Sequence, residues 1–350
     1  MILQSALIKR LGPPSDYSEG NHLVLQLGGN DPETIRRCVE KSLDLYNFRE
    51  INLNCGCPSI ESGGNPTFGA SLMKNIELTS RLVESLKNGG SDIDVSVKCR
   101  IAVLDSIQEL RDLNDEDYMY LYQYIEAIKN AKGNHVVLHA RPAILSGLSP
   151  VKNRLVPKLN YDFAHRISMD FPDMRITLNG GINSSEDLIK MCSKYSSSID
   201  GYMAGRWVLR RPLDLVAIES QLQKIQLRPL HLIQSAIDSY GERVIQTIMH
   251  KEKNVPLSEL CLPLYLVIEQ LKEDYSEEND ESKGSVLLNN VEIESLYEDL
   301  HSIICEVESI KGGKAVHRNV DYNFKKLTSA LKGIVGTKVF NKWKRNRLEL

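Results

Sequence analysis

The sequence predicts an α/β protein: a (β/α)8 TIM barrel followed by an all-helical C-terminal domain. Between residues 22 and 206, short apolar segments alternate with segments whose apolar residues recur at helical spacing. Strands that are separated by helices form parallel sheets with crossover connections. Polar residues and glycines close the apolar segments, and in barrels of this kind the carboxyl ends of the strands carry the chemistry. The chain has 350 residues, enough for one such domain and a smaller one.

Six strands and four helices are predicted in this region. The strands cover residues 22–29, 50–54, 94–101, 135–141, 175–182 and 199–206. The helices cover residues 31–46, 75–88, 115–131 and 184–195. Asp31 suits an N-cap and Pro32 the first helical position, which defines the start of the first helix. A doubly wound open sheet would need a glycine fingerprint after its first strand, and "GGNDPE" does not provide one.

The pattern changes near residue 222, which separates the predicted domains 1–222 and 223–350. Four helices are predicted beyond it, over residues 229–251, 258–272, 289–309 and 321–336. Residues 273–284 are acidic and poor in apolar side chains, so this insert is predicted to be disordered. The net charge of -3 hides an asymmetry, because residues 273–308 hold twelve acids and one base and residues 311–350 hold eleven bases and two acids. The basic end is a candidate surface for a polyanion, with a solvated helix face as the alternative.

Cysteine usage and hydropathy indicate the compartment. The seven cysteines are odd in number and irregular in spacing, and no signal peptide precedes them, which favours free thiols in a reducing compartment. No apolar run is long enough to span a bilayer, so no membrane association is predicted. The N-terminal segment is too short and too lightly charged for a transit peptide. A cytoplasmic protein is therefore expected, with an organelle as the alternative.

The segment "INLNCGCPS" (51–59) begins as a strand and ends in a Gly-Cys-Pro corner. Its cysteines form a CxC rather than a CxxC, and no second pair with ligand spacing follows, so no metal site is predicted. Pro58 cannot donate to a strand ladder, which places Cys57 in a loop at the carboxyl rim of the sheet. Cys55 stays at the strand end, where a small buried residue is the favoured interpretation.

Other strand ends carry residues suited to an anion. Lys98 ends a strand, and a buried lysine is costly unless it meets an anion or a polar ring atom, although a lysine that reaches solvent at the sheet edge is the alternative. His139 and Arg141 share one face of the next strand. His139 alone could be a hydrogen-bonded core residue, but beside Arg141 and Lys98 an anion or flavin site is the better account. A phosphate site is predicted after the last two strands, at Gly180, Gly181, Gly205 and Arg206.

The motifs of the first 220 residues resemble the tRNA-dihydrouridine synthase family. They are "INLNCGCPS", "FGASLM" (68–73), "VKCRI" (97–101), "HARPAILSGLSPVKNR" (139–154), "LNGGI" (178–182) and "GYMAGR" (201–206). The segment "HRNVDYNFKK" (317–326) resembles, more weakly, the helical tRNA-binding domain of that family. Its members are FMN enzymes that reduce specific uridines of tRNA with NADPH. The part "SGLSPVKNR" resembles the A-type branch, the tRNA-dihydrouridine(20/20a) synthases, which acts on the D-loop.

The resemblance implies roles for individual residues. Cys57 matches the catalytic cysteine, which donates a proton to C5 of the uracil while reduced FMN delivers hydride to C6. An ordinary cysteine thiol, with a pKa of about 8.5, is protonated at neutral pH and suits a general acid. The matched flavin-binding positions are Gln26, Lys98, His139, Asn179, Gly180, Gly181, Gly205 and Arg206. The matched tRNA-binding positions are Asn54, Arg141, Arg154 and Arg318. FMN and NADPH are the implied cofactors, tRNA is the implied partner, and a monomer is expected.

The sequence also departs from the family pattern. Family members begin with a strand that ends in Ala-Pro-Met, and we expect this chain to lack it, so that "ILQSALI" (2–8) adds at most a poorly paired seventh strand and FMN is held weakly. Ala102 stands where glycine is common, and Pro142 stands where lysine is common, which is expected to remove one RNA contact. Two alternatives stay open: another FMN-dependent barrel oxidoreductase, such as a dihydroorotate dehydrogenase, and a catalytically impaired protein that only binds tRNA.

Overall fold

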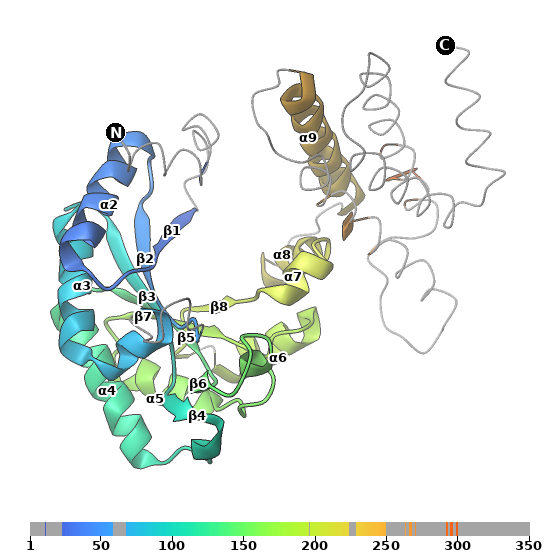
Figure 1. Cartoon of the computed structure of the whole chain (residues 1–350). Helices are drawn as coiled ribbons and strands as arrows, with labels where there is room; N and C mark the ends of the chain where they lie inside the picture. The colour runs from blue at the N-terminus through green and yellow to red at the C-terminus, as the bar shows by residue number, and fades with distance from the viewer. Residues whose placement is uncertain are drawn as a thin grey trace, which may run out of the picture. The chain divides into compact units, whose positions relative to one another are not determined.

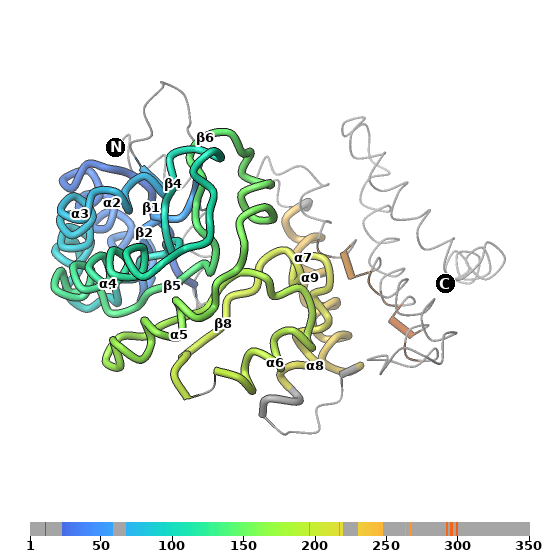
Figure 2. Tube along the Cα trace, turned by 90° about the horizontal axis from the view of Figure 1, so that it is seen from below, coloured from blue at the N-terminus to red at the C-terminus, as the bar shows by residue number. Residues whose placement is uncertain are grey.

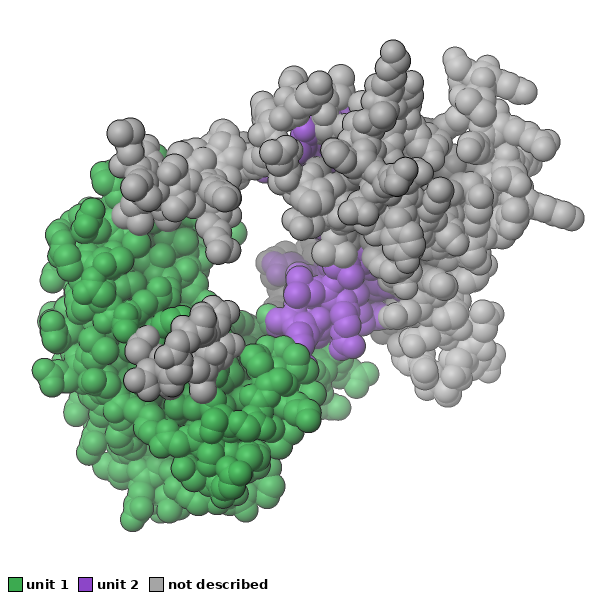
Figure 3. All heavy atoms as spheres, viewed as in Figure 1, with its two compact units in different colours: residues 1–204 green, residues 205–350 purple. Residues whose placement is uncertain are grey.

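The computed structural model describes residues 23–58, 68–195, 197–223 and 229–249, together with Leu11 and isolated positions between Pro263 and Asp299. Backbone contacts divide the chain into two compact units, Met1–Ala204 and Gly205–Leu350 (Figure 3). The predictions for residues 2–8, for the insert 273–284, for the helices at 258–272, 289–309 and 321–336 and for Arg318 lie outside the described ranges, apart from a few isolated positions.

A sheet of six parallel strands forms the centre of the first unit (Figure 1). Its order is β1-β2-β3-β5-β7-β8, which follows the chain, whereas a doubly wound sheet reverses its strand order at a switch point. The strands are β1 (Val24–Leu27), β2 (Glu50–Cys55), β3 (Asp94–Arg100), β5 (His135–His139), β7 (Arg175–Asn179) and β8 (Gly201–Met203). All six predicted strands are thus confirmed, although β8 is shorter than predicted. Parallel strands alternating with helices confirm the α/β class and are consistent with the barrel fold.

The helices of the first unit follow the strands and cover the outer side of the sheet. They are α2 (Pro32–Leu45), α3 (Ile76–Asn88), α4 (Asp115–Asn130), α5 (Tyr161–Asp170) and α6 (Ser185–Tyr195). Figures 1 and 2 both place α2, α3 and α4 in a row along β1, β2 and β3. Asp31 caps α2 as predicted, because its carboxylate accepts a hydrogen bond from the Thr34 amide at 2.8 Å. The sequence analysis missed α5, which begins at the N-cap Asn160.

A second, two-stranded parallel sheet was also missed. It pairs β4 (Val103–Ser106) with β6 (Ala143–Ser146), which follow β3 and β5 after only a few residues. The 3-10 helix η2 (Gly69–Lys74) packs against it, so that Ala70 lies in a small apolar cluster with Ala143 and Leu145. Two further 3-10 turns, η3 (Ile107–Glu109) and η4 (Lys152–Arg154), complete these connections.

Alternation along the strands sorts side chains into two sets. One set is apolar, buried and packed in the main core against the helices: Ile51, Leu53, Val95, Val97, Val136, Leu138, Ile176 and Leu178. The other set is polar and shares the opposite face of the sheet, as expected from the two-residue period of a strand. At the amino ends of the strands, His135 bonds Glu50 and Thr177, each at 2.9 Å, and Arg175 pairs with Glu50 at 3.1 Å. At the carboxyl ends, the same face carries the candidate site.

The second unit is helical where it is described. It contains α7 (Arg206–Arg210), α8 (Asp214–Gln223) and α9 (Pro229–Met249). Residues 205–222, which the sequence analysis assigned to the first domain, group with this unit. Gln270 explains part of this grouping, because it accepts from the Leu213 amide at 2.9 Å and donates to Asp214 at 2.7 Å. No helix within the described residues combines the length and apolar character needed to cross a bilayer.

Candidate active site

Cys57 lies in a loop whose backbone is held on both sides. Asn54 Oδ1 accepts hydrogen bonds from the amides of Gly56 (3.0 Å) and Cys57 (3.1 Å). The Cys57 carbonyl accepts from the Ala70 amide at 2.8 Å. Gly69 has a φ of 69°, and a Cβ there would lie 2.5 Å from Cys57 O, so only glycine permits this close approach. The loop position predicted for Cys57 is confirmed, and its side chain is partly exposed.

Cys55, two residues earlier, is a core residue. It is fully buried and lies opposite Cys99 in the register of β2 and β3. Burial raises the pKa of the Cys55 thiol to about 12, so this thiol stays protonated at physiological pH. The interpretation of Cys55 as a small buried residue is confirmed. No group of three or more potential metal ligands occurs among the residues that the structure describes.

Lys98 and Asn179 meet across the sheet. Lys98 Nζ donates to Asn179 Oδ1 at 2.9 Å, and Asn179 Nδ2 donates to the Met203 carbonyl at 2.7 Å. Burial, with a smaller contribution from the positive charge of Arg100, lowers the pKa of Lys98 to about 8. Lys98 is therefore a partly buried amine that loses its charge as the pH rises through about 8, and Asn179 is its polar partner within the protein. The anion or polar ring atom expected opposite Lys98 stays a prediction.

His139 sits among cations at the end of β5. Only 8% of its surface is exposed. Burial, followed by the charges of Arg100, Lys98, Arg141 and Arg154, lowers the pKa of His139 to about 2. The imidazole is therefore neutral at physiological pH, where it can donate one hydrogen bond and accept another. We call Lys98, Arg100, Arg141 and Arg154 the cation cluster, and its chemistry suits an anionic or electron-rich ligand.

Arg100 is a site residue that the sequence analysis did not single out. It ends β3, is 3% exposed, and directs its guanidinium toward backbone carbonyls. It donates to Gly56 O at 3.1 Å, to Pro142 O at 3.2 Å and to Asn153 O at 3.3 Å. The available signal was its spacing of two residues from Lys98, which places both side chains on one face of the strand.

Two glycines form the turn after β7. Gly180 and Gly181 have φ values of 104° and 77°, a region that favours glycine. A Cβ on Gly180 would lie 2.5 Å from His139 Cδ2, and one on Gly181 would lie 2.3 Å from Tyr161 Oη. Tyr161 in turn donates to the Gly180 carbonyl at 3.0 Å. The glycines predicted for this turn therefore let the backbone approach His139 closely.

The remaining predicted residues lie in four places. Arg141 donates to the Leu155 and Pro157 carbonyls. Arg154 belongs to η4, and its Nε is buried without a hydrogen-bond partner among the described residues. Gln26 donates to Asn52 Oδ1 at 2.8 Å, as part of the polar face of β1 and β2. Gly205 and Arg206 begin the second unit, where Gly205 is the N-cap residue of α7.

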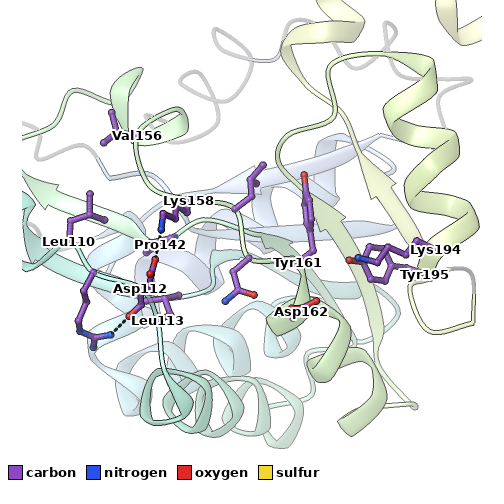
Figure 4. Close-up of a pocket in the computed structure, with 13 residues that line it drawn as sticks. Leu110, Asp112, Leu113, Pro142, Val156, Lys158, Tyr161, Asp162, Lys194 and Tyr195 are labelled. Carbon is purple, nitrogen blue, oxygen red and sulfur yellow. Dashed lines mark hydrogen bonds and ion pairs between the residues drawn. The ribbon is translucent and has the colours of Figure 1, made fainter.

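Asn153 holds the turn that carries Arg154. Its side chain is fully buried, accepts from the Ile144 amide at 2.7 Å and donates to the Ile144 carbonyl at 2.9 Å. Beside this turn, a pocket of about 690 Å³ is lined by both polar and apolar side chains, including Pro142, Lys158 and Tyr161. Figure 4 shows Lys158 close to Asp112, its partner in an exposed ion pair of 2.8 Å.

The family follows from comparison with known proteins. The model of the dihydrouridine synthase (Dus) family matches residues 8–298, most of the chain. The chain belongs to the dihydrouridine synthase family. This confirms the resemblance drawn from the sequence motifs. The matched range contains Cys57 and every member of the cation cluster.

Curated members of the dihydrouridine synthase family show the same relationship at moderate identity. The chain is 35% identical over 224 residues to the tRNA-dihydrouridine(20/20a) synthase of Salmonella typhimurium, covering 63% of each protein. It is 36% identical over 225 residues to that of Escherichia coli K12, covering 63% of this chain and 60% of the relative. The protein of that name from Shewanella oneidensis is 33% identical over 223 residues, with 63% and 62% covered. The chain thus spans less than two thirds of the length of these relatives.

The likeness to solved structures is much weaker. A dihydrodipicolinate synthase family protein from Coccidioides immitis shares 10% identity with this chain, with a TM-score of 0.29 and with 83% of this chain and 96% of that chain covered. A similarity at this level supports no argument about fold or function.

The side chains at this site fit the flavin that the dihydrouridine synthase family resemblance implies. A flavin ring presents carbonyl oxygens and ring nitrogens, which Lys98 and the neutral His139 can meet with donors. The turn formed by Gly180 and Gly181 follows the carboxyl end of β7, where backbone amides of a glycine turn could donate to a phosphate. The buried Nε of Arg154 is a donor that a ligand could satisfy.

Proposed function

We propose that this protein is an FMN- and NADPH-dependent tRNA-dihydrouridine synthase that reduces uridines in the D-loop of tRNA. One observation carries the proposal: in a member of this family, a partly exposed cysteine, on a loop held by backbone hydrogen bonds, is accompanied by a cluster of four cations around a buried, neutral histidine. The proposed substrate, tRNA, comes from the relatives, which are tRNA-dihydrouridine(20/20a) synthases.

The flavin would be held by residues at the carboxyl ends of the strands. Lys98 and His139 face its pyrimidine edge, and Asn179 keeps Lys98 in place through their 2.9 Å hydrogen bond. Gln26 supports the same polar face from β1. Gly180 and Gly181 would lie next to its phosphate. Gly205 and Arg206 stay predictions for phosphate binding that rest on the resemblance alone. When bound and reduced by NADPH, FMN supplies the hydride for C6 of the uracil.

Cys57 supplies the proton. Its thiol S–H bond breaks as the C5–H bond of the uracil forms, which leaves a thiolate that must be reprotonated before the next turnover. Hydrogen bonds from the Cys57 amide to Asn54 and from the Ala70 amide to the Cys57 carbonyl hold the backbone of this loop in place. A general acid gains from this rigidity, since the thiol is held in place before the base arrives.

The tRNA would be bound mainly through its phosphates, with the target base withdrawn from its stack to reach the flavin. Arg141 and Arg154 belong to the cation cluster around His139, and Asn54 accepts hydrogen bonds from the Gly56 and Cys57 amides, so these three side chains are the proposed tRNA contacts near Cys57. The domain 223–350, with Arg318 in its basic end, would bind the tRNA body. The protein would act as a monomer in the cytoplasm or in an organelle that contains its own tRNA.

The test is a spectrum followed by an activity assay. Purified protein should show the absorption bands of a flavin. With NADPH and unmodified tRNA, it should form dihydrouridine at D-loop positions mapped by mass spectrometry. Flavin binding with oxidation of a small substrate such as dihydroorotate, and no change in tRNA, would instead indicate another FMN oxidoreductase. Binding of tRNA by a protein that takes up no flavin would indicate a tRNA-binding protein without redox activity.

A further inference from the structure

Arg100 joins three segments that surround Cys57. Its Nε donates to Gly56 O, the carbonyl immediately before Cys57. Its Nη1 donates to Pro142 O and to Asn153 O, the carbonyl immediately before Arg154. The backbone amide of Arg100 donates to the sulfur of Met73 in η2 at 3.3 Å. The same 3-10 helix supplies the Ala70 amide that donates a hydrogen bond to Cys57 O. One side chain therefore connects the Cys57 loop, the turn after β5 and the turn that carries Arg154.

Burial makes the positive charge of Arg100 energetically unfavourable. The residue is 3% exposed, and within the described part of the chain its guanidinium bonds carbonyls and no carboxylate. A buried ion without a counter-ion costs several kcal/mol, about as much as a buried salt bridge loses when one partner is removed. A neutral donor such as glutamine could make the same hydrogen bond to the Cys57 loop without burying a charge. The positive charge of Arg100 therefore needs an explanation.

The charged groups around Arg100 identify the partner of this charge. Burial, followed by the charges of Arg154 and Arg141, lowers the pKa of Arg100 to about 10, whereas Cys57 acts in the opposite direction. Lys98 and the neutral His139 are the other titratable side chains near it, and neither offers a negative charge. Gly56, whose carbonyl accepts from Arg100 Nε at 3.1 Å, is bonded directly to Cys57, so the Cys57 thiol is the acidic group next to this guanidinium.

We propose that Arg100 is a positioning residue for Cys57. Its guanidinium holds the Cys57 loop through the hydrogen bond to Gly56 O, and its charge stabilises the thiolate that remains after Cys57 gives up its proton. The inference rests on the proposed function, in which Cys57 protonates C5. The S–H bond breaks, the C5–H bond forms, and the negative charge appears on Sγ, where a preorganised cation lowers the energy of the transition state. The reductant is the NADPH-reduced flavin already named.

The test measures Cys57 directly and does not require turnover. The rate at which iodoacetamide alkylates Cys57 reports its thiolate, because the thiolate is the nucleophile. It is followed between pH 5 and 10 by peptide mass spectrometry in the full-length protein and in Arg100→Met, Arg100→Gln and Arg100→Lys. The control is Arg166→Met, which removes a cation on α5 that pairs with Asp115 at the surface. Thermal unfolding shows which variants are folded.

The neutral variants should alkylate about tenfold more slowly at pH 7, with their profiles moved to higher pH, because the thiolate has lost its nearby cation. Arg100→Lys keeps a charge and should stay within about threefold of the wild type, and Arg166→Met should match it. Folded neutral variants with a wild-type profile overturn the proposal. If neither neutral variant folds, the Arg100→Lys variant provides the test. A folded Arg100→Lys protein whose Cys57 alkylates about tenfold more slowly than in the wild type overturns the proposal.

The same measurement separates this inference from the proposed function. If the wild-type protein forms no dihydrouridine but the neutral variants show the shifted profile, the proposed reaction fails and the action of Arg100 on Cys57 stands. If the wild-type protein is active and the profiles do not differ, the reaction stands and the role of Arg100 is wrong.

Discussion

Cys55 and Cys57 are separated by a single residue but have opposite environments, and this difference predicts their roles. Cys57 is partly exposed in a fixed loop, whereas Cys55 is buried in the core. Cys57→Ala should retain FMN and tRNA binding and lose most dihydrouridine formation, because the proton donor is gone. Cys55→Ala should retain activity and lose about 1 kcal/mol of stability. Single-turnover assays and urea unfolding of both variants check this, and a Cys57→Ala variant at the wild-type rate would exclude the general-acid role.

Lys98 predicts how flavin binding depends on pH. Its pKa is lowered to about 8, so the free protein loses this charge as the pH rises through 8. A ligand that prefers the charged amine raises that pKa on binding, and its affinity must then fall above pH 8. FMN titrations from pH 6.5 to 9.5 should show weaker binding at the alkaline end. Lys98→Met should bind FMN more weakly and without this slope, and a persistent slope in that variant would assign it to another group.

The site residues predicted from the sequence share a simple signal. Arg100 has the same signal, since it lies two residues after Lys98 at the end of β3, but the contacts that give Arg100 and Asn153 their roles have none. Lys98, His139 and Asn179 are polar residues at the ends of apolar strands, so their place at the carboxyl rim follows from the two-residue period and the parallel sheet. The contacts of Arg100 and Asn153 are with backbone carbonyls and amides of distant segments. Such partners exist only once the turns have folded, and no spacing in the sequence reveals them.

At the scale of elements, the same limit explains which segments were missed. The six sheet strands were predicted because each is a short apolar run bounded by polar or glycine residues. The strand β4 begins directly after Ile101 and Ala102, so its apolar residues merge with the run of β3. The helix α5 shows apolar residues Phe163, Ala164 and Ile167 on its buried face, but it is only ten residues long and follows an irregular segment. Whether a short strand such as β4 or a short helix such as α5 forms depends on tertiary packing rather than on the local sequence pattern.

The turn after β7 predicts a contrast between two glycines. Gly180→Ala adds a Cβ 2.5 Å from His139 in a left-handed backbone, so we expect a loss of about 1–3 kcal/mol of stability and weaker FMN binding. Gly28→Ala is the matched control, because a Cβ at Gly28 meets nothing within 4 Å. Urea unfolding and FMN titration of both variants test this. Equal effects of the two substitutions would show that the turn tolerates a side chain.

The amino ends of the strands predict an acid-sensitive contribution to stability. Burial raises the pKa of Glu50, but hydrogen bonds from His135 and Ser96 and the charges of His135 and Arg175 outweigh it and lower the pKa to about 2. A carboxylate with a lowered pKa stabilises the fold above its unfolded value of 4.5, and this stabilisation is lost as the pH falls toward 2. Glu50→Gln should therefore destabilise strongly at pH 7 and little near pH 2.

The control for Glu50 is an exposed ion pair. Asp112 and Lys158 are 81% and 82% exposed, and such pairs contribute about 0–1 kcal/mol. Asp112→Asn should therefore change the free energy of unfolding little at either pH. Urea unfolding at pH 7 and near pH 2 compares the two variants. If Glu50→Gln costs the same at both pH values, its carboxylate charge does not stabilise the strands.

At the scale of the whole molecule, the two units have different parts in the proposed reaction. The first unit contains Cys57 and the cation cluster, which act on one base. A tRNA is far larger than this site, and binding energy from its distant phosphates would have to come from elsewhere on the protein. Charge is distributed accordingly along the chain, since the excess of bases lies in residues 311–350, far in sequence from Cys57.

Deleting residues 311–350 is therefore predicted to separate tRNA binding from the flavin site. This segment has a net excess of nine bases (11 − 2). Its loss should weaken tRNA binding by about tenfold or more and flatten the dependence of affinity on salt, because fewer counterions are released from the RNA. Filter binding between 50 and 200 mM KCl measures both quantities, and FMN titration serves as the control, which should be unchanged. Unchanged tRNA affinity in the truncated protein, or a wild-type affinity that ignores salt, would place the RNA-binding surface outside the basic end.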